Sequence, residues 1–243
     1  MFNSISIQLL KEKLEKLGIK KVEFIINTHA HTDHTGGNSS FEEAKVIMQK
    51  DWREVKKYEF WFGKEELIKK PDVEFEDQYL LEYAPTRIEA KKTGGHSFDH
   101  CVVLMNNILF CGDLLVSNRH DKKSIPYFYY TSPSSFRNAL TQLRELILTL
   151  KPKYIVPGHG VVIDCDSAMC IMGFYERYLD LLNQTAPELY KCKEDDQMFQ
   201  YFSLQKLFPE TRFVKSAEYM HERNLVLIKQ ILSCQNSSPD RQK

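Results

Sequence analysis

Residues 22–37 read VEFIINTHAHTDHTGG, and this stretch decides the fold. Its opening residues, 22–28, are mostly apolar and rich in β-branched side chains, which predicts a short buried strand. A run of polar residues follows where that strand ends, and functional loops are commonly found at such places. The residues of this run that can bind a metal are His29, His31, Asp33 and His34.

These four side chains are of the types that bind metals such as zinc. Because side chains alternate along a strand, the imidazoles of His29 and His31 point to the same side. Asp33 and His34 come just past the turn, so they can face the same space from another direction. A lone histidine is usually a surface or hydrogen-bonded residue, but four ligand-type residues within six positions point to a metal site. Two neighbouring ligand sets suit two metal ions better than one.

Three further motifs follow along the chain, each built around one residue that can bind a metal. They are Thr93-Gly94-Gly95-His96-Ser97, Cys111-Gly112-Asp113 and Pro157-Gly158-His159-Gly160. Together with the first motif, and in this order, they resemble the signature of the metallo-β-lactamase superfamily, with Gly94 where proline is usual. The resemblance covers about residues 4–164. It is highly specific for the superfamily and much less specific for a substrate.

The resemblance implies a site that holds two divalent metal ions. Zinc is the metal expected by default, and iron or manganese would fit the same mixed histidine and carboxylate set. The implied ligands are His29, His31 and His96 for the first metal, Asp33, His34 and His159 for the second, and Asp113 as the bridge between them.

The activity that the resemblance implies is hydrolysis. A hydroxide bridging the two metal ions would attack an ester, thioester, lactone or amide, and Asp33 would be the catalytic residue that accepts a proton from the attacking water. Two alternatives stay open. One is a metal-dependent nuclease that cleaves RNA or single-stranded DNA, and the other is a catalytically impaired relic, against which the intact ligand set argues.

The composition favours a small-molecule substrate over nucleic acid. Lys+Arg and Asp+Glu both number 33, so the formal net charge is zero, whereas duplex-binding surfaces usually carry an excess of Lys and Arg. The N-terminus lacks the basic start and apolar core of a signal peptide, and no apolar stretch approaches the roughly 20 residues needed to cross a bilayer. We therefore expect a cytoplasmic protein without a membrane partner, in which the six cysteines are free thiols.

The order of the predicted elements favours an α+β fold. Strand and helix patterns mix in the first two-thirds of the chain, and only helix patterns follow Asp166. The resemblance implies the metallo-β-lactamase αββα sandwich, here N-terminally incomplete because the usual opening strands and their Asp-Thr-Gly turn are not found before residue 22. A truncated start and a partner chain that completes the sheet are both explanations. We divide the chain into a metallo-β-lactamase-type domain, 1–165, and a helical C-terminal extension with a polar tail, 166–243.

Local patterns predict the individual elements. Apolar runs predict strands at 44–48 and 87–93, and Asn106-Asn107 predicts the turn of a β-hairpin. Ser132 and Pro133 predict the start of a helix, as its N-cap and first residue. We expect further helices at 51–62, 167–184 and 216–233, and loop with short strand pieces at 71–86.

Several other residues have weaker claims to a function. His100, four residues past His96, resembles a second histidine found after this motif, and we weigh a role beside the ligands equally against a structural one. The aromatic run 127–130 is expected in the core more than in the pocket, and His120 and His221 are expected at the surface. The C-terminal helices are predicted to cover one side of the pocket and shape substrate choice, with packing on the outer sheet or a homodimer contact as alternatives.

Overall fold

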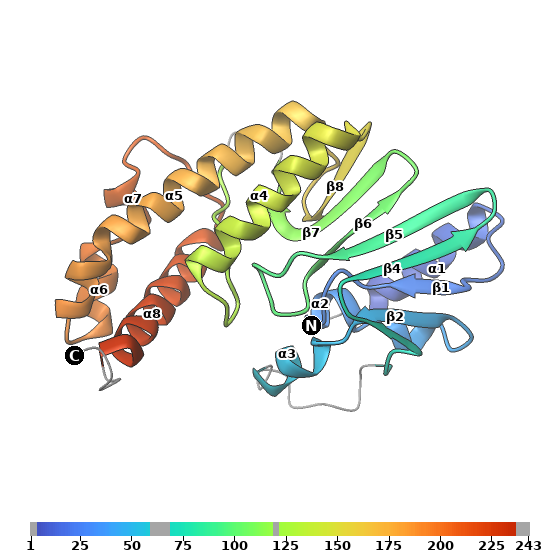
Figure 1. Ribbon diagram of the computed structural model, residues 1–243, viewed down its shortest axis with the longest axis horizontal. Coiled ribbons are helices and arrows are strands. Elements are labelled where there is room, and N and C mark those ends of the chain that lie inside the picture. Colours follow the sequence, from blue (N-terminus) through green and yellow to red (C-terminus); the bar gives the residue numbers. More distant parts are fainter. Residues whose placement is uncertain (1–3, 59–68, 119–121, 237–243) are drawn as a thin grey trace.

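The computed structural model describes residues 4–58, 69–118 and 122–236. Two β-sheets pack face to face with helices on their outer sides, and a further group of helices extends from one end of the molecule (Figure 1). The chain thus has the α+β architecture, with its helical extension, that the sequence predicts.

The first sheet is small and fully parallel. Its strands run in the order β1-β2-β3, with Ile25 opposite Val46 and Ile47 opposite Val73. Parallel strands are covered on both faces, which explains why these segments are nearly continuously apolar. The strands are β1 (Phe24–Ile26), β2 (Lys45–Gln49) and β3 (Val73–Phe75), and the helical elements around them are α1 (Ser4–Lys16), α2 (Thr32–Thr35), the 3-10 turn η1 (Asn38–Ser40) and α3 (Trp52–Tyr58).

The second sheet has a mixed topology and runs in the order β4-β5-β6-β7-β8. Neighbours among its first four strands are antiparallel, whereas β8 is parallel to β7. The predicted hairpin joins β6 to β7, and Asn106 in its turn has a left-handed backbone with φ of 54°, which asparagine tolerates better than most residues. The strands are β4 (Gln78–Tyr83), β5 (Thr86–Lys92), β6 (Cys101–Met105), β7 (Ile108–Val116) and β8 (Tyr154–His159).

Three hydrophobic clusters hold the layers together. Ile47 and Ala90 belong to the cluster between the two sheets, and Trp52 belongs to a smaller one that joins the first sheet to α3. The largest cluster joins the second sheet to α4 (Pro133–Leu150) and α5 (Cys165–Lys191) and continues into the C-terminal extension. Full burial of one large apolar side chain contributes about 1.5–3 kcal/mol, so these clusters are the main source of stability.

Helix α4 begins where the sequence predicts. The Ser132 hydroxyl oxygen accepts a hydrogen bond from the Ser135 backbone N–H at 3.1 Å, and Pro133 is the first helical residue. At the other end Lys151 takes a left-handed conformation with φ of 46° and closes the helix after Leu150. Both ends of the helix that covers the second sheet are therefore fixed by local chemistry.

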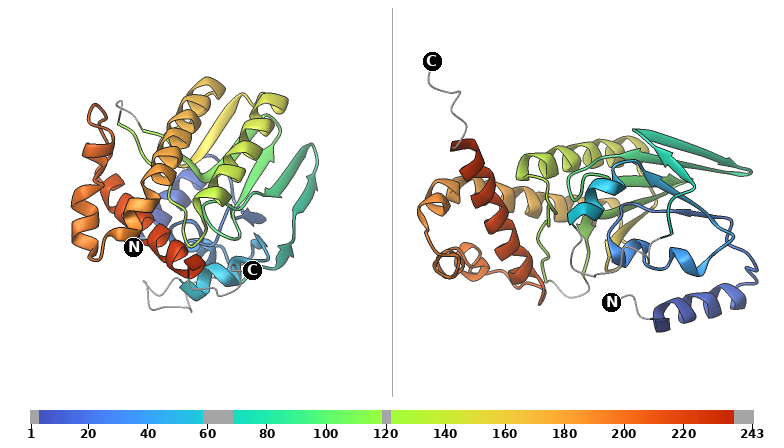
Figure 2. Two further views of the ribbon diagram at one scale, coloured as in Figure 1. Left: turned by 60° about the vertical axis from the view of Figure 1, so that its left-hand side comes forward. Right: turned by 90° about the horizontal axis from the view of Figure 1, so that it is seen from below.

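The C-terminal extension lies at one end of the molecule (Figure 2). Its first helix, α5, is longer than expected. It begins after Asp164, whose side chain accepts a hydrogen bond from the Ser167 N–H at 2.8 Å, and it continues through Pro187. The sequence patterns do not predict α6 and α7, since both are too short to show a clear helical repeat. The other helices are α6 (Asp195–Tyr201), α7 (Leu204–Leu207) and α8 (Ala217–Asn236).

One expectation is refined and one is wrong. The segment 71–86, expected to be loop with short strand pieces, contains strands β3 and β4. Strand β4 is an edge strand with four of its six residues exposed, so its hydrophobic alternation is weak. His221, expected at the surface, is 0% exposed. His120 and the predicted helical residues 59–62 lie outside the described residues.

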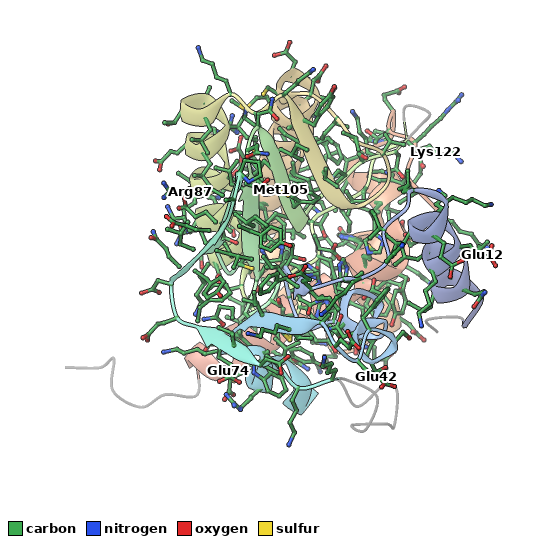
Figure 3. All side chains as sticks on the ribbon, turned by 90° about the vertical axis from the view of Figure 1, so that its right-hand side faces the viewer. Glu12, Glu42, Glu74, Arg87, Met105 and Lys122 are labelled. Atoms are coloured by element: carbon green, nitrogen blue, oxygen red, sulfur yellow. The ribbon has the colours of Figure 1, made fainter. Side chains whose placement is uncertain are left out.

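The surface carries the charged side chains. Glu42, Arg87 and Lys122 are exposed and lie around the edge of the molecule (Figure 3). Exposed ion pairs such as Lys21–Glu43, at 3.5 Å, contribute little to stability because water screens them. Among the described helices, none combines the length and the apolar character that crossing a bilayer would require.

The close packing of the His96 loop against α4 can be tested at Gly95. This glycine has φ of +89°, and an added Cβ would lie 2.5 Å from the Ala139 Cβ. We expect Gly95→Ala to lower the free energy of unfolding, measured by urea denaturation, by about 2 kcal/mol or more. Gly173→Ala is the control, because an added Cβ within α5 would meet nothing within 4 Å and should stabilise the helix by about 0.5–1 kcal/mol. Equal stability of Gly95→Ala and the wild type would contradict this packing.

Candidate metal centre

Four strands bring metal-binding side chains to one place. The segment after β1 supplies the first motif, the loop after β5 supplies His96, β7 supplies Asp113, and β8 supplies His159 as its last residue. The ligand atoms gather in two groups, and within each group they all lie within 4.8 Å of one another. All the metal ligands expected from the sequence are therefore brought together. The groups are His29, His31, His96 and Asp113, and Asp33, His34 and His159.

The first group is compact and buried. Nδ1 of His31 lies 3.0 Å from Nε2 of His96. Oδ2 of Asp113 lies 3.6 Å from that same His96 nitrogen and 4.0 Å from Nε2 of His29. Three imidazoles and one carboxylate thus present donor atoms to one small space, and this mixed nitrogen and oxygen set is one that zinc binds.

The second group lies on the open side of the site. Nε2 of His159 lies 3.1 Å from Oδ2 of Asp33, and Nε2 of His34 lies 3.5 Å from the same oxygen. The side chains of Asp33 and His159 are 52% and 51% exposed. A small molecule can therefore approach the site from the side of Asp33 and His159.

Asp113 lies between the two groups. Its Oδ1 is 3.3 Å from Nε2 of His34, and its Oδ2 is 3.5 Å from Nε2 of His159 and 3.6 Å from Nε2 of His96. One carboxylate therefore contacts both groups. Gly158 makes this approach of β8 to β7 feasible, because a Cβ there would lie 1.9 Å from Oδ1 of Asp113.

The unpartnered atoms of the site fit metal ions. Nε2 of His29, Nε2 of His34 and Oδ1 of Asp113 are buried and make no hydrogen bond to the described part of the chain. Buried polar atoms normally have a partner, and leaving one without costs about 1–3 kcal/mol. Metal ions bound at the two groups would satisfy these atoms.

Hydrogen bonds on the far side of two rings orient the ligand nitrogens. Nδ1 of His96 lies 2.6 Å from the Tyr127 carbonyl oxygen. Because a carbonyl can only accept, this nitrogen carries the proton and leaves Nε2 free to bind a metal. Nδ1 of His29 lies 3.1 Å from the Thr28 hydroxyl, which leaves its Nε2 facing the ligand group.

The histidines of the first group are held neutral. Burial lowers the pKa of His29 well below its usual value and also lowers the pKa of His96. Burial, together with neighbouring His96, lowers the pKa of His31 to about 3. The three imidazoles are therefore unprotonated at neutral pH, which is the form that binds metals.

The second group, by contrast, attracts positive charge. The carboxylates of Asp113 and Asp33 raise the pKa of His159 to about 10. Burial lowers the pKa of His34, but the Asp113 carboxylate, 3.3 Å away, outweighs burial and the net direction is upward. Burial raises the pKa of Asp113, but its contacts with His159 and His34 outweigh that and hold the pKa well below its usual value. Without metal, this group holds a proton in the region where a cation would bind.

Two asparagines to which none of the sequence motifs points shape the first motif. The Asn27 amide donates a hydrogen bond to the His34 carbonyl oxygen at 2.9 Å, and the Asn38 amide donates to the Asn27 side-chain oxygen at 2.8 Å. Both asparagines are buried. They fix the turn that carries Asp33 and His34, and the sequence offers no signal for them beyond their position next to the motif.

The aromatic run 127–130 divides between the core and the site. Phe128 is fully buried in the largest hydrophobic cluster, as expected. The ring of Tyr129 instead meets the ring of His31 edge-on, with centroids 4.5 Å apart, and Tyr127 supplies the carbonyl that orients His96. The expectation of a core role therefore holds for Phe128, whereas Tyr127 and Tyr129 lie beside the ligands.

His100 lies against the ligands without joining either group. It is fully buried, and its Nδ1 lies 3.0 Å from the Thr93 hydroxyl. Its ring centroid is 5.3 Å from that of His29 and 5.9 Å from that of His96. His100 therefore packs directly behind two ligand rings.

Comparison with known proteins agrees with this geometry. The sequence matches the profile of the Metallo-beta-lactamase superfamily over residues 1–159. It is 27% identical over 170 residues to a probable metallo-hydrolase of Methanocaldococcus jannaschii, a match that covers 64% of this chain and 78% of the relative. It is 25% identical over 158 residues to an N-acyl homoserine lactonase of Bacillus cereus, covering 61% of this chain and 60% of the relative.

A solved structure shares the fold. A metallo-beta-lactamase from Pontibacter korlensis superimposes with a TM-score of 0.55 at 23% identity, over 68% of this chain and 75% of that chain. The profile match covers well over half of the chain and ends on the ligand His159. The chain therefore belongs to the metallo-beta-lactamase superfamily and is a metal-dependent hydrolase of that superfamily.

Proposed function

We propose that this chain hydrolyses an ester, thioester, lactone or amide of a small molecule at a centre of two divalent metal ions, with zinc as the default metal. The observation that carries the proposal is the position of Asp113, whose two oxygens contact both groups of histidines. The similarity to an N-acyl homoserine lactonase supports an acyl substrate. The equal numbers of acidic and basic residues lower the case for a phosphodiester substrate.

Two metal ions in such a site would lower the pKa of a shared water molecule and polarise the oxygen of the bond to be cleaved. The protein's own residues have distinct parts. Buried His29, His31 and His96 would hold an inner metal ion, and the second group, on the open side, would hold an outer one. Asp113 contacts both groups and would connect the two positions. Asp33 has a half-exposed carboxylate at the open side, where it can accept a proton from the attacking water and pass it on. The ring of Tyr129 packs edge-on against the ring of His31 and limits the positions that this imidazole can take.

The test of this function is a substrate panel run on protein of defined metal content. Protein stripped with a chelator and reloaded with zinc, manganese or iron is assayed on chromogenic esters, thioesters, lactones, amides and phosphodiesters. We expect turnover of at least one acyl substrate that disappears with the metal and returns on reloading. Turnover of phosphodiesters alone would replace this proposal with the nuclease alternative, and no metal-dependent turnover of any substrate would favour the relic.

The bridging role of Asp113 gives a sharper prediction. We expect Asp113→Ala to bind fewer than two metal ions per chain and to lose more than about a hundredfold in kcat, because even residues behind metal ligands contribute 10–100-fold. Asp196→Ala is the control, since Asp196 is an exposed carboxylate on α6, remote from the ligand groups. Metal content by mass spectrometry and initial rates measure the effect. Near-normal rates in Asp113→Ala would remove this residue from the centre.

Metal binding should release protons. Since the pKa of His159 is raised to about 10 without metal, this imidazole is protonated at neutral pH and must lose its proton to bind a metal. Affinity for the outer metal should therefore rise with pH up to about 10 and fall, by about tenfold per unit for one proton, as pH drops.

Calorimetry in buffers of different ionisation enthalpy counts the released protons. We expect His159→Asn to release about one proton fewer than the wild type, because this position no longer carries a titrating imidazole. An unchanged proton count in His159→Asn would show that His159 is not protonated in the metal-free protein.

A further inference from the structure

A buried polar network connects the C-terminal helices with the metal ligand His96. Tyr178 of α5 and His221 and Asn224 of α8 expose 0%, 0% and 1% of their surface. The Tyr178 hydroxyl lies 2.9 Å from Nδ1 of His221 and 3.0 Å from the Asn224 amide nitrogen. Three polar side chains within an otherwise apolar cluster require an explanation, because apolar residues of the same size would pack there at no cost in unmade hydrogen bonds.

The direction of every hydrogen bond in the network is determined. Nε2 of His221 lies 2.6 Å from the Phe202 carbonyl oxygen, which can only accept, so Nε2 carries the proton. Burial lowers the pKa of His221, so the ring is neutral and its Nδ1 accepts a hydrogen bond from the Tyr178 hydroxyl. The Tyr178 oxygen in turn accepts from the Asn224 amide. The amide group of Asn224 is therefore held in one orientation.

The second N–H of that amide reaches the segment beside the metal site. The Asn224 amide donates to the Pro126 carbonyl oxygen at 2.8 Å. The neighbouring residue, Arg223, interacts electrostatically with the side chain of Tyr127. Two successive residues of α8 therefore hold the two successive residues Pro126 and Tyr127.

The same segment holds His96. The Tyr127 carbonyl accepts the Nδ1 proton of His96 at 2.6 Å, and the Tyr129 N–H donates to the His96 carbonyl oxygen at 2.7 Å. His96 is thus held at its ring and at its backbone by residues 127 and 129. The orientation of its metal-binding Nε2 depends on where this segment lies.

The Asn224 side-chain oxygen adds an independent observation. It is buried and makes no hydrogen bond within the described residues. A buried amide oxygen without a hydrogen-bond partner lowers the stability of the fold. The benefit of an asparagine here must therefore come from its nitrogen, which donates hydrogen bonds to Tyr178 and Pro126.

We propose that Asn224 is a positioning residue for the metal centre: through the Pro126–Tyr129 segment it fixes the ring of His96, so that the C-terminal extension controls the affinity of the inner metal position. The proposal rests on the proposed function in one respect, namely that His96 binds a metal. Because coupling between two sites is reciprocal, metal bound at His96 also stabilises the packing of α8.

The first test compares Asn224→Ala with Leu225→Ala. Leu225 is the next residue of α8 and is equally buried, but it lies in the apolar cluster. Competition with a chromophoric chelator measures zinc affinity, the visible spectrum of the cobalt-loaded protein reports ligand geometry, and thermal unfolding reports stability. We expect Asn224→Ala to lose roughly tenfold in affinity for the tighter zinc ion with a shifted cobalt spectrum.

The controls separate positioning from stability. Leu225→Ala should lower the unfolding temperature while affinity stays within about twofold of the wild type, since the hydrogen bond from Asn224 to Pro126 remains in that variant. The zinc affinity of Tyr178→Phe, a nearly isosteric change, should lie between those of the wild type and Asn224→Ala. This variant loses the hydrogen bond from Asn224 to Tyr178 but keeps the Asn224 amide. Equal losses of affinity in Asn224→Ala and Leu225→Ala, or wild-type affinity in a folded Asn224→Ala, would overturn the proposal.

A measurement on the metal-free protein tests the positioning role of Asn224 separately from metal binding. Long-range proton–nitrogen NMR of the imidazoles should show His96 in the wild type as the Nδ1–H tautomer only, and as a mixture of tautomers in Asn224→Ala. An unchanged tautomer in that variant would contradict the positioning role even if the wild type bound metals well. Failure of the wild type to bind any metal, with the tautomer still responding to Asn224, would instead reject only the metal-binding function.

Discussion

The burial of the Asp113 carboxylate among histidines is the constraint on which the rest of the structure depends. A buried charge is stable only when oppositely charged groups or hydrogen-bond donors compensate it. Here His34 and His159, whose pKa values are both raised, lie within 3.5 Å of the carboxylate. His34 comes from the segment after β1 and His159 from the end of β8, so both sheets have to meet at this point for the charge to be compensated.

The packing between the layers of the fold holds the strands that meet at Asp113 in place. The cluster between the sheets holds β2 and β3 against β5 and β6, and helices α4 and α5 cover β7 and β8 on the other face. The large cluster runs without interruption from these strands into α8. The extension therefore shares its packing with the strands that carry Asp113 and His159, and the polar network of Tyr178, His221 and Asn224 continues that connection to His96.

The clustering of the candidate ligands was predictable from sequence because each of these residues stands in a short motif of unusual composition. The fold was predictable to the same extent, since buried strands and the Ser132-Pro133 helix start leave local signals. The bounds of the edge strand β4 and the short helices α6 and α7 were not predictable, because their residues are too exposed or too few to form a repeat. The burial of His221 was also not predictable from the sequence, because the partners of this histidine depend on packing between segments far apart in the chain.

The central claim is that two metal ions bind side by side with Asp113 between them. Anomalous X-ray diffraction from crystals of the zinc-loaded protein tests this claim most directly. We expect two anomalous peaks about 3.5–4 Å apart, one among His29, His31 and His96 and one among Asp33, His34 and His159, with Asp113 in contact with both. A single peak, or peaks at residues outside these two groups, would contradict it.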